Sequence, residues 1–360
     1  MEPSIKVIIR CLVYNHEPYL RDCLDGFVMQ KTNFPFKAVV HDDCSTDGSA
    51  SILREYAEKY PDIIEPIYET ENLYSKRDGS LGRVMAKACN GRSKYFALCE
   101  GDDYWIDPYK LQKQVDYMDS HPECTMTYTN VYVDTQQGRL YRAEQEKLWG
   151  EIRCDDSIVD TEYVISQCAA TIHTCSLLFK ANLRDDFPAA AARCYVGDYP
   201  LEIFAALKGY LYGFSDVTAV YRYQVPGAWS SQQNCEKSQT LLANWLTVVE
   251  MHKAMDEYSG GKYHLCFVKE SINLVAGLLL SKPSLIYDAC EINRYVTLFS
   301  YKHCSPVLTV DGIGWIKKLI LKIKYYPFYP FYSPICKLVS TLTLWQRIKI
   351  AWQYMCNQLK

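Results

Sequence analysis

The first part of the chain alternates between buried-strand and amphipathic-helix patterns, and this alternation restricts the possible folds more than any other feature. Short apolar runs predict the strands, and apolar residues at helical spacing predict the segments between them. The predicted strands are 5–13, 36–43, 63–68 and 94–99, and the predicted helices are 17–31, 48–60, 83–89 and 107–122. This alternation favours an α/β fold, in which a mostly parallel sheet is covered by helices on both faces.

The pattern changes after residue 123. Shorter strand-like pieces follow, at 126–133, 173–179, 210–214 and 217–223, with one helix that begins at Asp198. We expect this part to complete the same α/β unit as its second half. From residue 230 to 299 the chain is predicted to be helical, with the strongest patterns at 241–255 and 268–280.

Two acidic segments directly follow predicted strands. HDDCSTDGS (residues 41–49) follows the second strand, and EGDDYW (residues 100–105) follows the fourth. In sheets of this kind, ligands bind outside the carboxyl ends of the strands, so the two segments are expected to meet at one edge. Carboxylates gathered there favour a cation or a ligand rich in hydrogen-bond donors. In the alternative interpretation, Asp102 and Asp103 only form a turn and cap the next helix.

The composition excludes several classes of protein. A formal net charge of -3 gives no reason to expect a nucleic-acid partner. The amino-terminal sequence does not have the pattern of a signal peptide, and no apolar stretch is long enough to span a bilayer, so we expect a cytoplasmic protein. The 16 cysteines are scattered without a CxxC pair, which favours reduced, buried thiols over a disulfide framework.

Several familiar catalytic and nucleotide-binding motifs are absent from the sequence. There is no GxxxxGKS/T loop, no GxGxxG turn after the first strand, no GxSxG elbow and no HExxH helix. A carboxylate-rich edge without a glycine cradle would repel a diphosphate unless a divalent cation lay between them. Carboxylate oxygens suit Mg²⁺ or Mn²⁺, and Mg²⁺ usually takes only one or two of them from the protein.

Three segments, in this order along the chain, resemble the family 2 glycosyltransferases with the GT-A fold. They are VYNHEPYLRDCLDGFVMQ, FKAVVHDDCSTDGSASILREYA and YFALCEGDDYWIDPYKLQKQVDYMDSHPE. The resemblance implies an inverting transfer of a sugar from a nucleotide sugar, in the synthesis of bacterial surface polysaccharide. It implies a GT-A domain, expected at 1–229, with a nucleotide-sugar half at 1–123 and an acceptor half at 124–229. The helical pattern predicts an extension at 230–310, and the composition predicts a basic, aromatic tail at 311–360.

The resemblance also assigns contacts to the nucleotide. Tyr14, Asn15 and Glu17 follow the first strand, where the family packs the base. Asp43 matches the carboxylate that accepts a hydrogen bond from the base, and Asp42 beside it would support the loop. The expected donor is a UDP-sugar, and the expected acceptor is a glycan or a lipid-linked glycan.

EGDDYW takes the place of the family's DxD motif, with Glu100 where an aspartate is most common. The resemblance makes Asp102 and Asp103 the contacts to the ribose and to Mg²⁺ or Mn²⁺. Family members differ in which of the two touches the metal, so both are assigned as metal ligands and Asp102 also to the donor. Gln224 departs from the pattern, because the family often has a histidine near this position that helps to hold the metal or the diphosphate.

Asp198 matches the family's catalytic base. It begins the predicted helix in VGDYPLEIFAALKG, and Glu202, one turn further on, is the fallback. The base would remove a proton from the acceptor hydroxyl while that oxygen attacks the anomeric carbon opposite the leaving group, which inverts the configuration. In the alternative interpretation, Asp198 only caps the helix.

Two other functions stay open at this point. A sugar nucleotidyltransferase shares the α/β nucleotide-binding layout, but it would need a glycine-rich, basic loop where this chain has VYNHEPYL. An inactive relic that binds nucleotide or glycan would account for the unusual residues Glu100 and Gln224.

The tail at 311–360 has a different character, with eight lysine or arginine residues and one acidic residue. In GWIKKLILKIKYY, helical spacing separates most of the apolar and aromatic residues from the lysines. This pattern suits the interface of an anionic membrane and would place the enzyme at the inner face of the cell membrane. A helix packed on the enzyme with solvated lysines would have the same pattern.

Overall fold

The computed structural model describes residues 5–167, 172–232 and 238–281. The chain divides into two compact units, Met1–Glu236 and Lys237–Lys360, and each is described here by itself. The predicted domain boundary after residue 229 stays a prediction. The boundary after residue 310 and the tail at 311–360 lie outside the described residues.

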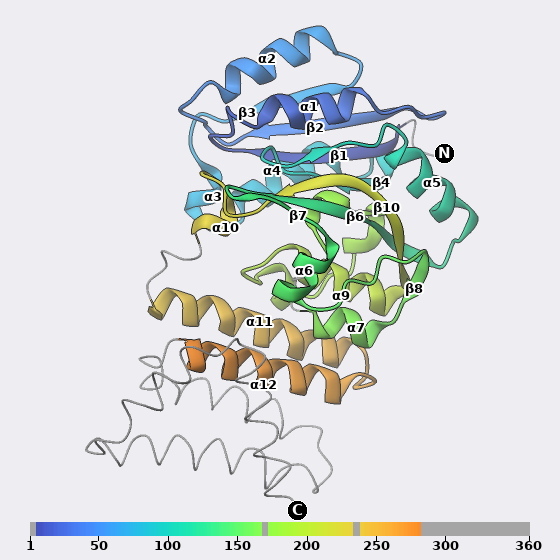
Figure 1. Cartoon of the computed structure of the whole chain (residues 1–360), viewed down its shortest axis with the longest axis vertical. Coiled ribbons are helices and arrows are strands. Elements are labelled where there is room, and N and C mark those ends of the chain that lie inside the picture. Colours follow the sequence, from blue (N-terminus) through green and yellow to red (C-terminus); the bar gives the residue numbers. More distant parts are fainter. Residues whose placement is uncertain (1–4, 168–171, 233–237, 282–360) are drawn as a thin grey trace, which may run out of the picture. The chain divides into compact units, whose positions relative to one another are not determined.

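The predicted alternation of strands and helices in the first part of the chain is confirmed (Figure 1). The elements are β1 (Ile5–Val13), α1 (Leu20–Val28), β2 (Phe36–Asp42), α2 (Ser49–Lys59), β3 (Ile64–Tyr68), α3 (Leu73–Lys76), α4 (Ser80–Cys89) and β4 (Ser93–Leu98). These four strands are parallel, with β1 between β2 and β4 and with β3 outside β2.

The side chains of β1 alternate between the two faces of the sheet. Val7, Ile9, Cys11 and Val13 are buried in a hydrophobic core with side chains from α1, α2 and α5. Helix α4 packs against β1 and β2 and lies across the sheet from α1 and α2 (Figure 1). Because both faces of the sheet are covered, the sequences of the parallel strands are nearly continuous apolar runs.

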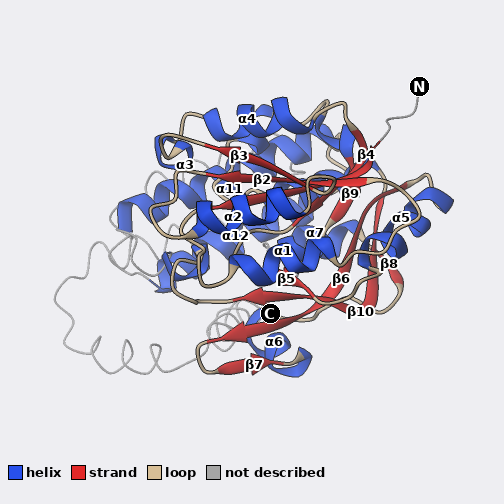
Figure 2. Ribbon diagram, turned by 90° about the horizontal axis from the view of Figure 1, so that it is seen from above, coloured by secondary structure: helices blue, strands red, loops and turns tan. Residues whose placement is uncertain are grey.

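The second part of the unit makes the sheet mixed. Its elements are β5 (Tyr104–Trp105), α5 (Lys110–Ser120), β6 (Cys124–Thr135), β7 (Gly138–Leu140), α6 (Arg142–Trp149), β8 (Ser157–Val159), α7 (Thr161–Ser166), η1 (Thr174–Ser176), β9 (Leu178–Lys180), η2 (Ala181–Arg184), α8 (Ala189–Ala192), α9 (Asp198–Lys208), β10 (Tyr210–Arg222) and α10 (Trp229–Gln232). The sheet order is β3-β2-β1-β4-β9-β6-β10-β5, and β9 lies antiparallel between β4 and β6. Long β6 and β10 run side by side and parallel (Figure 2).

Two predicted segments of this part differ from the structure. The strand expected at 173–179 is a short 3₁₀ turn, η1, followed by the short strand β9. The separate pieces expected at 210–214 and 217–223 are one strand, β10, in which register shifts near Phe214 and Val217 absorb extra residues. A β-bulge of this kind interrupts the alternation of side chains without ending the strand.

In its described part, the second unit consists of the helices α11 (Ser238–Tyr258) and α12 (His264–Ser281), which pack on each other. The helical character predicted for this region is confirmed in α10, α11 and α12, and residues 282–299 lie outside the described part. The buried imidazole of His252 shares a hydrogen bond of 2.9 Å with the hydroxyl of Ser271. None of the helices in the described parts of the chain is both long and apolar enough to cross a membrane.

Helix α1 packs against β5 at a position that needs glycine. A Cβ atom at Gly26 would lie 2.8 Å from the backbone nitrogen of Trp105 and 3.0 Å from its carbonyl oxygen. The neighbouring Phe27 packs edge-on against the Trp105 ring, with 5.1 Å between the ring centroids. The absent side chain therefore allows α1 to approach β5 closely.

We predict that Gly26→Ala lowers the free energy of unfolding by about 1–3 kcal/mol, because the added methyl group meets backbone atoms that cannot move aside independently. Gly82→Ala in α4 is the matched control, since nothing lies within 4 Å of its Cβ position. That control should be neutral or stabilising by roughly 0.4–1 kcal/mol. Urea unfolding of both variants tests the close approach, and equal stabilities would contradict it.

Candidate active site

The loops that follow β1 and β2 are tied together at the carboxyl edge of the sheet. The backbone nitrogen of Asn15 donates to the hydroxyl of Ser45 at 3.0 Å, and the Asn15 side-chain oxygen accepts from the backbone nitrogen of Thr46 at 2.8 Å. Asn15 has a φ of 56°, a left-handed conformation that asparagine tolerates better than most residues. Asn15 therefore holds the loops that follow β1 and β2 together at the carboxyl edge of the sheet.

Glu17 and Tyr14 of the same loop differ in their surroundings. The carboxylate of Glu17 accepts from the backbone nitrogen of Gly48 at 2.8 Å, which places its charge at the beginning of α2. A negative charge at a helix amino terminus is favourable. Tyr14 is 42% exposed at the edge. The assignment of Tyr14, Asn15 and Glu17 to the nucleotide stays a prediction.

Asp43 is buried at the end of β2 and holds the next loop in place. Its two carboxylate oxygens accept the backbone N–H groups of Leu73 at 2.7 Å and Tyr74 at 2.9 Å, at the beginning of α3. An ionised carboxylate has about four acceptor positions, and these two backbone donors occupy two of them. The predicted contact between Asp43 and a nucleotide base is compatible with this geometry and stays a prediction.

Glu100 joins β4 to β1. Its carboxylate accepts from the backbone nitrogen of Leu12 at 2.9 Å. Burial raises the pKa of Glu100 to about 8, since removal from water disfavours the charged form. The first carboxyl of EGDDYW is therefore engaged with the sheet.

Asp102 and Asp103 are held by the end of β10. The backbone nitrogen of Arg222 donates to a carboxylate oxygen of Asp103 at 2.8 Å, and the Arg222 guanidinium donates to the carbonyl oxygen of Asp102 at 2.8 Å. Burial raises the pKa of Asp103 well above its ordinary value, and the negative charge of Asp102 adds to this shift. The two predicted metal ligands are thus adjacent, and their charges repel each other.

These carboxylates would fit a cation that takes one or two ligands from the protein, because a positive charge would relieve the repulsion between them. In the described ranges, no three histidine, cysteine, aspartate or glutamate side chains are grouped so that they could hold a metal. The side chain of Gln224 is exposed and donates to the hydroxyl of Tyr223 at 3.1 Å. Water and diphosphate oxygens would have to complete the coordination, as Mg²⁺ prefers.

His16 is a neighbour of the acidic segment that the sequence analysis missed. A Cβ atom at Gly101 would lie 2.8 Å from Nδ1 of His16, so glycine allows the two to touch. This nitrogen is buried and has no hydrogen-bond partner among the described residues. Burial lowers the pKa of His16, and the charge of Asp102 opposes that shift. No periodic pattern in the sequence indicates this contact.

Segment 173–176 connects the acidic segment to Asp198 and was also missed. The carbonyl of Cys175 accepts from the Trp105 indole at 2.7 Å, and the carbonyl of Ser176 accepts from the buried Lys110 ammonium at 3.0 Å. The hydroxyl of Thr174 donates to the Asp198 carboxylate at 2.7 Å. The sequence shows only a short polar run before apolar residues, which does not reveal these contacts.

Asp198 is the first residue of α9, where the sequence predicted it, and it lies close to the acidic segment. Its negative charge acts on Glu100, and besides Thr174 its carboxylate accepts from the backbone nitrogen of Tyr199 at 2.9 Å. The side chain is only partly buried. The structure therefore brings Asp198 and EGDDYW to one place, although their roles stay predictions.

Glu202 is enclosed inside the protein. It is 1% exposed, and neither carboxyl oxygen has a hydrogen-bond partner among the described residues. Burial raises its pKa well above the ordinary value, and the charge of Asp198 acts in the same direction. An enclosed acid is poorly placed to contact an acceptor hydroxyl. The assignment of the base to Asp198, with Glu202 as the fallback, stays a prediction.

The α/β sheet with its acidic edge defines the class of protein: a GT-A fold. A solved structure of S. aureus TarS (residues 1–349), in complex with UDP-GlcNAc, is similar in fold, with a TM-score of 0.52 and 17% identity, over 85% of this chain and 95% of that one. Residues 9–184 match the model of the family described as glycosyl transferase family 2. This stretch of the chain is therefore similar to the family 2 glycosyltransferases.

Relatives similar in sequence include an uncharacterised protein, Mb1547 of Mycobacterium bovis. It is 34% identical over 219 residues, which cover 61% of this chain and 59% of the relative. TuaG of Bacillus subtilis, whose name assigns it to teichuronic acid biosynthesis, is 30% identical over 137 residues, or 38% of this chain and 50% of the relative. The matched part of the chain thus spans less than two thirds of either relative.

We predict that Glu202→Gln makes the stability of the protein less dependent on pH. Because the folded pKa of Glu202 is raised, its carboxyl favours folding while protonated, and this contribution is lost as the pH rises from about 4.3 through the folded pKa. Glutamine does not ionise, so the variant should gain stability over the wild type as the pH rises. Urea unfolding between about pH 5 and pH 8 measures this difference.

Glu162→Gln is the matched control, since Glu162 is an exposed residue of α7. It should follow the wild type across this pH range. If Glu202→Gln also follows the wild type, Glu202 ionises in the folded protein as it does in water, which would contradict its enclosed position.

Proposed function

We propose that this chain is an inverting glycosyltransferase that moves a sugar from a nucleotide sugar, most simply a UDP-sugar, to a glycan or lipid-linked acceptor in the synthesis of cell-surface polysaccharide. The match of residues 9–184 to the family 2 glycosyltransferases supports glycosyl transfer. The observation that carries the proposal is that Asp198 and EGDDYW, nearly a hundred residues apart in sequence, meet through segment 173–176 and the end of β10. A nucleotidyltransferase or a protein that only binds its ligand would not need a candidate base close to the acidic segment.

In the proposed reaction, Asp198 accepts the proton of an acceptor hydroxyl while that oxygen attacks the anomeric carbon of the donor. The bond from this carbon to the diphosphate oxygen breaks, and the nucleoside diphosphate leaves with the bonding electrons. A divalent cation bound at Asp102 and Asp103 would neutralise charge on the departing diphosphate. Thr174 and the backbone of Tyr199 fix the carboxylate of Asp198, so its orientation is set before the acceptor binds.

The place of action is part of the same proposal. Nucleotide sugars would reach the protein in the cytoplasm, and a lipid-linked acceptor would bring it to the inner face of the membrane. The basic, aromatic tail at 311–360 is proposed as the membrane contact from its sequence alone.

A donor panel tests the proposal directly. The full chain is incubated with UDP- and GDP-sugars, Mn²⁺ and a set of glycan acceptors, and the products are identified by mass spectrometry. Transfer with release of a nucleoside diphosphate supports the proposal. Release of pyrophosphate from a sugar phosphate and a nucleoside triphosphate would identify a nucleotidyltransferase, and donor binding without turnover would identify an inactive relic.

We predict that Asp198→Asn lowers the rate of transfer by about 10²- to 10⁴-fold, because the amide cannot accept a proton at neutral pH. Binding of the donor, measured by calorimetry, should stay close to that of the wild type. Asp160→Asn makes the same chemical change at a residue that caps α7 and pairs with Arg153. This control should lose stability but not transfer, and wild-type transfer in Asp198→Asn would refute the assignment of the base.

We predict that EDTA abolishes transfer and that Mn²⁺ or Mg²⁺ restores it. Asp102→Ala and Asp103→Ala should each lower the rate by about a hundredfold or more, because the charge on the leaving diphosphate is no longer neutralised. Asp119→Ala removes a carboxylate that pairs instead with Lys6 and Lys94 and serves as the control. Full activity of both Asp102→Ala and Asp103→Ala would exclude them as metal ligands.

A further inference from the structure

Four aromatic side chains form a cluster that the donor chemistry does not use. Trp149 ends α6, His173 precedes η1, and Tyr221 and Tyr223 lie at the end of β10. His173 stacks on Tyr221 with 4.7 Å between the ring centroids, and Trp149 makes perpendicular contacts to His173 at 5.5 Å and to Tyr223 at 5.1 Å. Trp149, Tyr221 and Tyr223 are only partly buried, so part of the aromatic surface is open.

This aromatic cluster lies beside the carboxylates of the active site. Tyr221 directly precedes Arg222, which holds the acidic segment. Burial raises the pKa of Tyr221, and the negative charges of Asp103, Asp102 and Asp198 raise it further. His173 directly precedes the threonine that bonds to Asp198. All four aromatic residues belong to the half of the unit that does not carry the predicted nucleotide contacts.

His173 brings an unused polar atom into the cluster. Its Nε2 is buried and has no hydrogen-bond partner among the described residues. Burial lowers the pKa of His173 to about 4, so the imidazole is neutral at pH 7 and can donate or accept one hydrogen bond. Leaving a buried polar atom without a partner costs about 1–3 kcal/mol. A ligand hydroxyl at this position would remove that cost.

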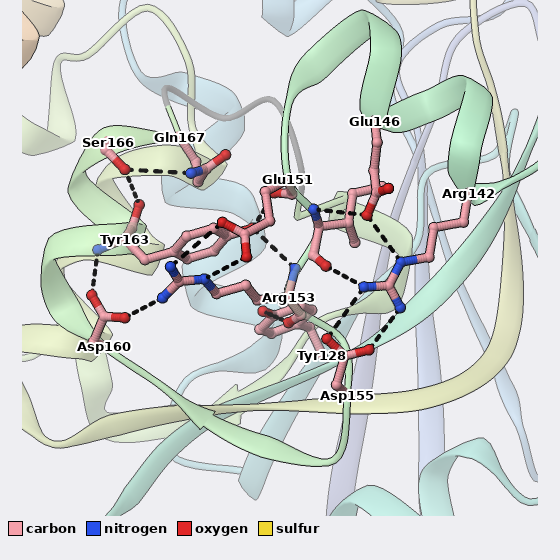
Figure 3. A network of polar contacts seen from close by, with 11 residues as sticks. Tyr128, Arg142, Glu146, Glu151, Arg153, Asp155, Asp160, Tyr163, Ser166 and Gln167 are labelled. Atoms are coloured by element: carbon pink, nitrogen blue, oxygen red, sulfur yellow. Dashed lines mark hydrogen bonds and ion pairs between the residues drawn. The ribbon is translucent and has the colours of Figure 1, made fainter.

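A network of polar contacts fastens the segments that precede and follow Trp149 (Figure 3). Arg142, at the beginning of α6, pairs with Asp155 at 2.7 Å and with Glu146 at 3.1 Å. In the loop that follows Trp149, Arg153 pairs with Asp160. The helix and the loop are thus fastened on both sides of Trp149, which suits a binding surface that is formed before its ligand arrives.

We propose that this aromatic cluster binds a pyranose ring of the acceptor glycan, an inference that rests on the proposed function. A pyranose presents apolar C–H groups on its faces and hydroxyl groups around its edge. The aromatic surface would cover a face, and Nε2 of His173 would bond to a hydroxyl, as in sites that combine an apolar wall with a few polar groups. A second hydroxyl of the same sugar would then point to Asp198.

The test compares Trp149→Leu, which keeps an apolar side chain, with Trp149→Phe, which keeps an aromatic ring. The acceptors are p-nitrophenyl pyranosides, and KM is measured separately for acceptor and donor. We expect Trp149→Leu to raise the acceptor KM by about tenfold or more and Trp149→Phe to raise it less, with the donor KM changed by less than about twofold. Leu148→Ala, at a neighbouring residue of α6 that is 58% exposed, should match the wild type.

An unchanged acceptor KM in Trp149→Leu, or an effect on the donor KM alone, would overturn the inference. Thermal unfolding shows whether the variants fold. If Trp149→Leu does not fold, the acceptor KM of Trp149→Phe decides the test. Saturation-transfer NMR with the same pyranosides separates the inference from the proposed function. A wild-type protein that binds the pyranosides through Trp149 but transfers no sugar refutes only the function, whereas one that binds none of them refutes the inference.

Discussion

The contacts of Arg222 hold the two halves of the first unit around one site. Its backbone donates to Asp103 and its guanidinium to the carbonyl of Asp102, and the same guanidinium pairs with Asp22 of α1. The cation lies 4.4 Å from the centroid of the Tyr104 ring and 5.0 Å from that of Tyr19, so much of its surface is removed from water. A single residue at the end of β10 thus joins the acidic segment and α1, and it fixes the positions of Asp102 and Asp103.

Burial opposes the ionisation of three carboxyl groups in or near the site. Burial raises the pKa of Glu100, Asp103 and Glu202 alike. In a protein selected only for stability, apolar side chains would serve better at such positions, because an enclosed carboxyl without partners costs free energy. Strain of this kind, concentrated at the edge where the strands end, is typical of sites whose ligand supplies the missing charge or hydrogen bonds.

The parts of the structure that depend on local pattern could be predicted from the sequence, and the parts that depend on distant contacts could not. Strand β1 has the predicted bounds, and α9 begins at Asp198 as predicted. A strand buried on both faces and a helix with apolar residues at helical spacing can each be recognised within a single segment of sequence. Segment 173–176 was predicted as strand, and its turn is fixed instead by Trp105 and Lys110 from elsewhere in the chain. The contact of His16 with Gly101 depends on how two loops approach each other, which no local pattern encodes.

The register shifts of β10 separate its two ends. Before the shifts near Phe214 and Val217 the strand pairs with β8 at Leu211, and after them it reaches Arg222 at the site. Since the irregular stretch takes up extra residues without moving the pairing on either side, a gain or loss of a residue there would leave Arg222 in place. The remote edge of this sheet is therefore free to diverge in length during evolution, and related chains could acquire different surfaces there while the chemistry at the other end of the same strand stays intact.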